Sequence, residues 1–147
     1  MDKATLHLIK LAVGAESIAS MAAWQAHVQS RSPKRKGTRL FHDTRMVPKR
    51  AGDILPTGSI FWVIKGVVSV RQRIVDIEAY EAGDGRRCRL WLDPSLIETR
   101  PQPRRPFQGW RYLRPEDAPA DLGAGSQTGE GDLPADMRAE LMELGLL

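Results

Sequence analysis

Basic and aromatic side chains that could bind a polyanion gather in two stretches of the sequence. Residues 31–50 hold eight basic residues and one acid, Asp43, and residues 100–114 hold five arginines interleaved with aromatic residues such as Trp110. Cations along a track neutralise phosphates, and flat rings stack on bases with roughly 1–3 kcal/mol per base. The two stretches therefore favour nucleic-acid binding. The alternative is a solvated basic surface with Trp110 in the core.

We expect arginines that are distant in sequence to meet around one concave pocket that also holds a tryptophan ring. Arginine outnumbers lysine here, which favours bidentate contacts to phosphates or base edges over a diffuse charge. The predicted nucleic-acid-binding residues are Arg45, Lys49, Arg50, Arg71, Arg73, Trp62, Trp110 and Arg111. Trp91 is a further candidate for stacking.

A second set of residues could hydrolyse an amide. A lysine of lowered pKa can activate the Thr44 hydroxyl while a carboxylate relays the proton, and Lys49 and Glu78 are the candidates for those roles. The spacing of the three is not distinctive, so the alternative is three unrelated surface residues. Whether the protein is an enzyme is left open by the sequence.

Metal and cofactor motifs are not apparent in the sequence. His42 and Asp43 could bind a metal together with Asp76 and Glu78, but no third histidine or cysteine follows at ligand spacing. The sequence contains no G-x-G-x-x-G, P-loop or G-x-S-x-G motif. We therefore expect neither a metal nor another cofactor.

The charge of the chain is divided unevenly. Residues 1–114 carry 21 Lys/Arg against 10 Asp/Glu, a net charge of +11, whereas residues 115–147 carry one arginine against eight acids, a net charge of −7. A basic body indicates a polyanionic partner. The acidic tail either keeps such a protein soluble or folds back over the basic face.

The composition is that of a soluble globular protein, with 41% apolar and 27% charged residues. No apolar run approaches the roughly 18 residues of a membrane span, and the N-terminus lacks the pattern of a signal peptide. The single cysteine, Cys88, cannot form an internal disulfide. We therefore expect a cytoplasmic protein with no membrane partner.

A β-hairpin over residues 58–78 is the element on which the predicted site depends. Five consecutive apolar residues, 60–64, lie between turn residues and predict a strand buried on both faces. Gly66 permits a tight turn, and the chain then returns as a second strand. The apolar parity of this strand changes near residues 71–73, so we expect a β-bulge there that aims Arg71 and Arg73.

The remaining patterns predict an α+β fold, a small mixed or antiparallel β-barrel with one or two packed helices. Other strands are expected over residues 5–13, 38–46, 86–93 and 107–113, and helices over residues 15–30 and 133–144. Residues 1–122 would form the barrel domain. Residues 123–147 would form an acidic linker and a short amphipathic C-terminal helix, which could bind a protein partner.

Several segments resemble a family of short alphaproteobacterial proteins known as domain of unknown function 1489. They are residues 7–14, 44–50, 58–66, 71–73 and 107–119, and the resemblance spans residues 6–122. The acidic tail after Leu122 lies outside it. The family has no established activity, so the resemblance implies identity more than mechanism.

A more distant resemblance is to the PUA-like superfamily, which includes the ASCH and EVE domains. It lies in residues 49–55 and Gly58, a Gly-Asp run that leads into a strand. The resemblance implies a small β-barrel that binds RNA or a modified base, in a pocket beside Arg45, Lys49 and Arg50. Some ASCH members are amidohydrolases or nucleases. A hydrolase of a modified nucleoside and a protein-interaction adaptor are therefore the alternatives to a nucleic-acid-binding module.

Overall fold

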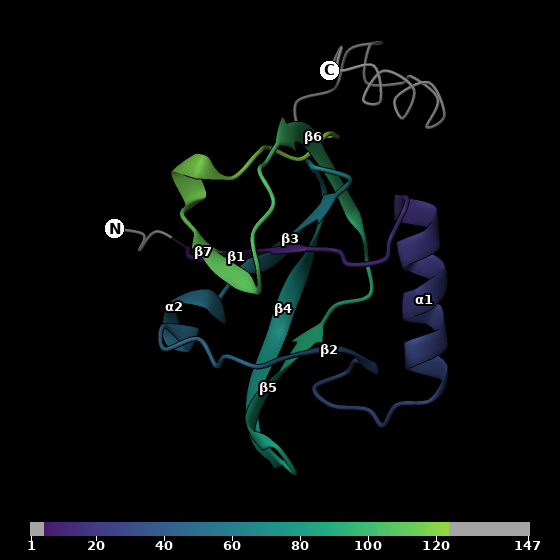
Figure 1. Ribbon diagram of the computed structural model, residues 1–147, viewed down its shortest axis with the longest axis vertical. Helices are drawn as coiled ribbons and strands as arrows, with labels where there is room; N and C mark the ends of the chain where they lie inside the picture. Colours follow the sequence, from purple (N-terminus) through teal and green to yellow (C-terminus); the bar gives the residue numbers. More distant parts are fainter. Residues whose placement is uncertain (1–4, 124–147) are drawn as a thin grey trace.

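The computed structural model describes residues 5–123 as one mixed sheet with two α-helices and a 3₁₀ turn (Figure 1). In chain order the elements are β1 (His7–Leu11), α1 (Ile18–Ser30), β2 (Leu40–Thr44), α2 (Ala51–Ile54), β3 (Ser59–Ile64), β4 (Val67–Ala82), β5 (Gly85–Leu92), β6 (Ile97–Pro103), β7 (Trp110–Leu113) and η1 (Pro115–Asp117). The predicted α+β class is confirmed. The helix predicted over residues 133–144 lies outside the described residues.

The strands follow the order β2-β5-β4-β3-β1-β7, and β6 pairs with the first half of β4. The pairing of β1 with β3 is parallel and the other pairings are antiparallel. Within residues 5–123 no strand pairing joins β2 to β7, so the sheet is not closed. Neither helix in this part of the chain is long and apolar enough to cross a bilayer.

The two ends of the open sheet nevertheless touch through side chains. The Trp110 indole Nε1 on β7 donates to the carbonyl oxygen of Met46, just after β2, at 2.8 Å. The backbone N–H of Arg50 donates to the Tyr112 hydroxyl, also on β7, at 3.2 Å. These contacts join the two ends of the sheet without completing a strand ladder.

The predicted hairpin is confirmed as β3 and β4. All six residues of β3 are buried. The turn residues Lys65 and Gly66 have φ angles of 51° and 80°, and positive φ at both central positions is characteristic of the type I′ turn that suits a two-residue hairpin.

The bulge predicted at residues 71–73 is wrong in its position. The pairing with β3 skips Ser69, and the pairing with β5 skips Val75. Val68 therefore packs with Phe61 on one face of the sheet while Val70 packs in the main core on the other. One extra residue reverses side-chain parity. The apolar pattern hides the bulge at Ser69, because Val68 and Val70 are two residues apart and look like one face of a regular strand.

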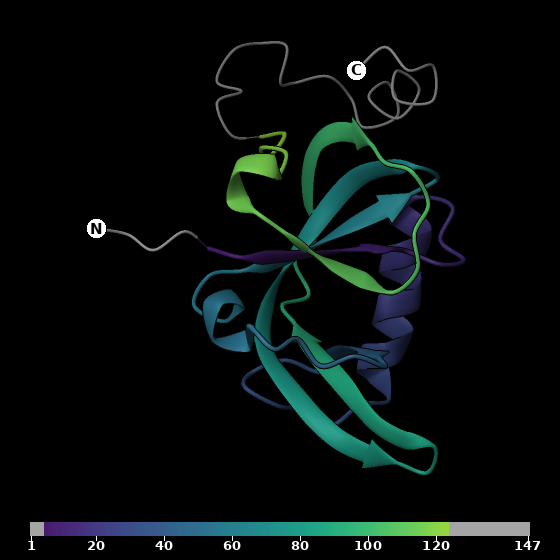
Figure 2. The same cartoon turned by 60° about the vertical axis from the view of Figure 1, so that its left-hand side comes forward.

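Helix α1 covers the face of the sheet that carries the main core (Figures 1 and 2). Ser17 caps its N-terminus, because its hydroxyl accepts from the N–H of Ser20 while the Ser20 hydroxyl accepts from the N–H of Ser17. Met21 and Gln25, four residues apart and so on one side of the helix, are its buried residues. The opposite face holds a smaller apolar cluster that includes Ile9, Phe61 and Leu113.

Candidate functional site

A hollow of about 380 Å³ lies between α1, the C-terminal end of β1 and the inner side of β2. This size is at the lower end of the range for small-ligand pockets. Most of its lining is apolar, and the rings of Trp24, His42 and Trp62 contribute. The lining includes Lys10, Val13, Met21, Trp24, Gln25, Leu40, Phe41, His42, Trp62 and Leu92. We call it the α1 hollow.

The floor of the α1 hollow is held by a buried network of amides. Gln25 and Gln72 exchange hydrogen bonds in both directions, at 2.8 and 2.9 Å, across α1 and β4. The Trp62 indole Nε1 donates to the same Gln72 oxygen at 2.9 Å, and Gln72 also donates to the Asp93 carbonyl at 3.1 Å. The Trp62 ring is therefore fixed in orientation, since satisfied buried polar networks are rigid.

His42 contributes the unusual polar group of the α1 hollow. Its ring meets the Trp62 ring edge to face at a centroid distance of 5.1 Å. Burial, assisted by the nearby Lys10 ammonium, lowers the pKa of His42 to about 4. The imidazole is therefore neutral at pH 7. Its Nε2 is enclosed and has no hydrogen-bond partner among the described residues.

The rim of the α1 hollow combines a cation with exposed apolar side chains. Lys10 is half-buried, and burial lowers its pKa. Trp24 and Val13 are 65% and 87% exposed, and Trp24 lies against the His27 ring at 5.4 Å. Exposed aromatic surface beside a concave, apolar lining suits a ligand that is itself a flat ring.

A second, shallow hollow of about 340 Å³ lies just beyond the other end of β2. Arg45, Val47, Pro48, Lys49 and Arg86 line it. The three cations are exposed and make no ion pair within the described part of the chain. We call this the cationic hollow. The predicted residues Arg45 and Lys49 do come together here, without a tryptophan.

The other arginines of the predicted pocket do not converge with these two. Arg71, Arg73 and Arg111 share the sheet face of Phe61 and Ile9, opposite to the face of Trp62. The expectation of one pocket that joins them to a tryptophan is therefore wrong. The reason is the register of β3 and β4, in which Arg71 is paired with Phe61.

Most of these arginines also have partners of their own. Arg71 forms a bidentate ion pair with Asp121, at 2.7 and 2.8 Å, and donates to the Ser59 hydroxyl. Arg50 pairs with Asp53 at 3.0 Å, and Arg73 donates to the Pro56 carbonyl at 3.2 Å. The Arg111 guanidinium lies 5.4 Å from the Phe107 ring.

Asp121 lies at the C-terminal end of the predicted barrel domain. Residues 120–122 are held beside β6, because Arg100 N donates to the Ala120 carbonyl and Leu122 N donates to the Glu98 carbonyl. The Arg71 guanidinium holds the pKa of Asp121 below its usual range.

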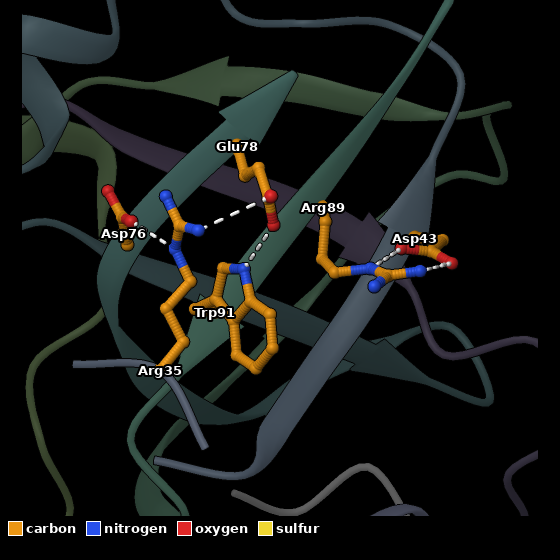
Figure 3. Close-up of polar contacts among 6 residues, drawn as sticks. All are labelled: Arg35, Asp43, Asp76, Glu78, Arg89 and Trp91. Atoms are coloured by element: carbon orange, nitrogen blue, oxygen red, sulfur yellow. Dashed lines mark hydrogen bonds and ion pairs between the residues drawn. The ribbon is translucent and has the colours of Figure 1, made fainter. Parts of the chain in front are cut away.

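The catalytic set of Thr44, Lys49 and Glu78 is not assembled. Thr44 is buried and shares the inner face of β5 with Cys88, whereas Glu78 lies beside Arg89 on the outer face. Figure 3 shows Glu78 accepting from the Trp91 indole at 2.9 Å and facing Arg35 at 3.3 Å. Its carboxylate oxygens are therefore occupied by structural contacts.

On the outer face of β2, β5 and β4, arginines form ion pairs with carboxylates and stack on aromatic rings. Arg35, from the basic loop, bonds to Asp76 at 2.7 Å and lies 6.0 Å from the Trp91 ring. Arg89 forms a two-bond ion pair with Asp43 and stacks on Phe41 at 4.1 Å (Figure 3). Trp91 is 3% exposed. It therefore lies under Arg35 and does not offer a stacking surface.

Polar residues of the two hollows that were not among the predicted binding residues are Lys10, Gln25, His42 and Arg86. A signal existed for His42, because it shares the inward parity of Leu40 and Thr44 on a predicted strand. A polar ring at an inward position needs a partner. Arg86 carried no such signal, since only the pairing of β5 brings it near Arg45.

The fold and these hollows define the class as an α+β protein with an open, mixed seven-stranded sheet whose ends meet through side chains. Over residues 8–147 the chain matches the family described as protein of unknown function (DUF1489), and it belongs to that family. The match includes the acidic tail, so the expectation that the tail lies outside the family is wrong. No match is found among curated proteins or solved structures.

Proposed function

We propose that this protein binds single-stranded nucleic acid along β2, with RNA as the first ligand to test. One observation carries the proposal: a single strand connects the aromatic α1 hollow, at residues 40–42, with the cationic hollow, at residues 45–49. Strand geometry separates His42 from Arg45 by about 10 Å. One nucleic-acid strand could therefore place a base in the α1 hollow and a phosphate at the cationic hollow.

The chemistry of each hollow supports the proposal. Arg45, Lys49 and Arg86 make no ion pair within residues 5–123, so their charges remain available to phosphates. Arg35, Arg71 and Arg89, by contrast, are partly neutralised by carboxylates. The net charge of +11 over residues 1–114 would attract the strand over a longer range.

The proposal also includes a PUA-like barrel and a cytoplasmic location. The curved sheet with linked ends is compatible with a PUA-like barrel, the resemblance that makes RNA the leading ligand. A cytoplasmic location fits the single Cys88, whose thiol is buried and has its pKa raised to about 11. A thiol of that kind is protonated and unreactive at pH 7.

The test is fluorescence anisotropy with short single-stranded RNA and DNA at several salt concentrations. The double variant Arg45→Ala/Arg86→Ala should bind more weakly. Its slope of log K against log salt should be shallower by about 1.4, because each phosphate contact on a single strand contributes about 0.7.

The matched control is Arg105→Ala/Arg111→Ala, which removes the same charge from the loop before β7 and from β7 itself. Its slope should stay close to that of the unmodified protein. An equal loss of affinity and of salt dependence in both double variants would show that only the net charge of the protein matters, and not the position of Arg45 and Arg86. No binding of either oligomer at low salt would end the proposal.

A further inference from the structure

His42 and His7 each pack against an aromatic ring, but only His7 has a hydrogen-bond partner among the described residues. Each imidazole packs edge to face on an aromatic ring, His7 on Phe61 at 5.0 Å and His42 on Trp62 at 5.1 Å. His7 Nδ1 accepts from the N–H of Ser59 at 3.0 Å, which holds β1 to the start of β3. His42 makes no hydrogen bond within the described part of the chain, although it lies against a hollow.

The position of His42 leaves one ring nitrogen for a ligand. Nε2 is enclosed, so Nδ1 is the nitrogen that can serve the α1 hollow. A neutral imidazole has one N–H and one lone pair, and in either tautomer Nδ1 offers a hydrogen-bonding function. That function is unused by the described residues.

The groups around His42 limit the chemistry of the ligand. Trp24 provides exposed ring surface at the rim, the fixed Trp62 ring forms the buried floor, and Gln25 keeps one amide hydrogen that the network with Gln72 does not use. Lys10 is the charged residue of the lining and disfavours a cationic ligand. A neutral nitrogen heterocycle matches this set, because it has an apolar face and a polar edge.

We infer that the α1 hollow takes a nucleobase turned out of its strand, and that His42 Nδ1 is the specificity-determining contact to the edge of that base. The inference rests on the proposed nucleic-acid binding and names the part of the ligand that this site reads. A base already in a single strand costs little to unstack. Its phosphates would lie toward Arg45.

The stability of the fold distinguishes a recognition role from a structural one. An enclosed nitrogen without a partner weakens the folded state, whereas an apolar ring of the same shape would not. His42→Phe should therefore fold at least as well as the unmodified protein at pH 7. His7→Phe should fold less well, because it leaves the Ser59 N–H without its acceptor.

The experiment compares a base-bearing single-stranded RNA with an oligomer of the same length that has an abasic backbone. The unmodified protein should bind the base-bearing oligomer about tenfold more tightly, and His42→Phe should lose that preference. His7→Phe should keep it. His42→Gln retains a hydrogen-bonding group and should recover part of it. In the unmodified protein, the ¹⁵N resonance of His42 Nδ1 should shift on binding.

The outcomes separate this inference from the proposed function. Salt-dependent binding with no preference for bases would overturn the inference and leave phosphate binding in place. A preference that survives in His42→Phe, or an unshifted Nδ1 resonance, would also overturn it. Binding of neither oligomer would remove the proposed function and the inference together.

Discussion

The protonation state of His42 follows from its position on β2. Burial, with Lys10 nearby, lowers its pKa from 6.5 to about 4. Between these pH values the unfolded chain binds more protons than the folded one, so the free energy of unfolding falls as the pH falls. His42 therefore makes the folded protein sensitive to mild acid.

The pH dependence of the unfolding free energy can be compared between the unmodified protein and the His42→Phe variant. Lowering the pH from 7 to 4.5 should cost the unmodified protein about 2.5 kcal/mol more of its unfolding free energy than it costs the variant. Urea unfolding at the two pH values gives both quantities, and carboxylates titrate alike in the two proteins. Parallel losses would show that His42 is not held neutral by the fold.

Individual arginines differ in their contacts because of partners distant in the sequence. Arg71 meets Asp121, fifty positions away, and Arg89 meets Asp43, forty-six positions away. Arg45 meets no carboxylate in the described residues, only the weaker field of Asp84. Residue type alone gives these three side chains the same expected role, so the sequence could not separate them.

At the scale of elements, β4 organises the molecule. Its first half pairs with β3 and β6 and its second half with β5. The skipped residues Ser69 and Val75 allow one strand to serve these different partners, because a bulge bends and twists its strand. The hairpin was predictable from Lys65-Gly66 and the apolar run before it, and so was a bulge in β4, whereas the bulge positions at Ser69 and Val75 were not.

The junction of α2 with β1 and β3 depends on Gly58. A Cβ there would lie 2.5 Å from the backbone oxygens of both Ile54 and Leu6, in space that backbone atoms cannot yield. Gly58→Ala should lower the unfolding free energy by roughly 1–3 kcal/mol, through the overpacking that forces backbone shifts. Urea unfolding monitored by tryptophan fluorescence measures the loss.

Gly52→Ala is the matched control, since a Cβ at that position in α2 meets nothing within 4 Å. Alanine is the better helix former, so this variant should be neutral or slightly more stable. Similar losses in the two variants would contradict the role given to the close approach at Gly58.

At the scale of the whole molecule, two hydrogen bonds link the ends of the open sheet. Trp110 reaches the Met46 carbonyl and Tyr112 accepts from Arg50 N. Since the cationic hollow lies between these residues and β5, the link also sets the position of Arg45 and Lys49. The two ends of the sheet are thereby joined without a continuous ladder.

The double variant Trp110→Phe/Tyr112→Phe should loosen this link. We expect a loss of about 1–2 kcal/mol in unfolding free energy, because two modest hydrogen bonds are removed. Amide exchange at residues 46–50 should become faster, as hydrogen–deuterium exchange would record. Trp24→Phe, which removes an indole N–H with no bond in the described part of the chain, should leave that exchange unchanged. Unaltered exchange in the double variant would show that the ends hold their places without the link.

The sequence by itself determined the local elements and their order. Alternation over residues 86–93, the stripe of α1 and the run of β3 are short-range patterns, and burial selects them directly. It also placed Leu40, His42 and Thr44 on one face of their strand. Such information is contained within a few neighbouring residues.

Only the tertiary structure decided which side chains meet. The skipped residue Ser69, the parallel pairing of β1 with β3 and the contact of Arg71 with Asp121 each depend on energies summed over the whole sheet. Arginines predicted to share one pocket were thus divided between opposite faces. The pairing of β5 with β2 brought Arg86 beside Arg45, because register and bulges are set by long-range packing.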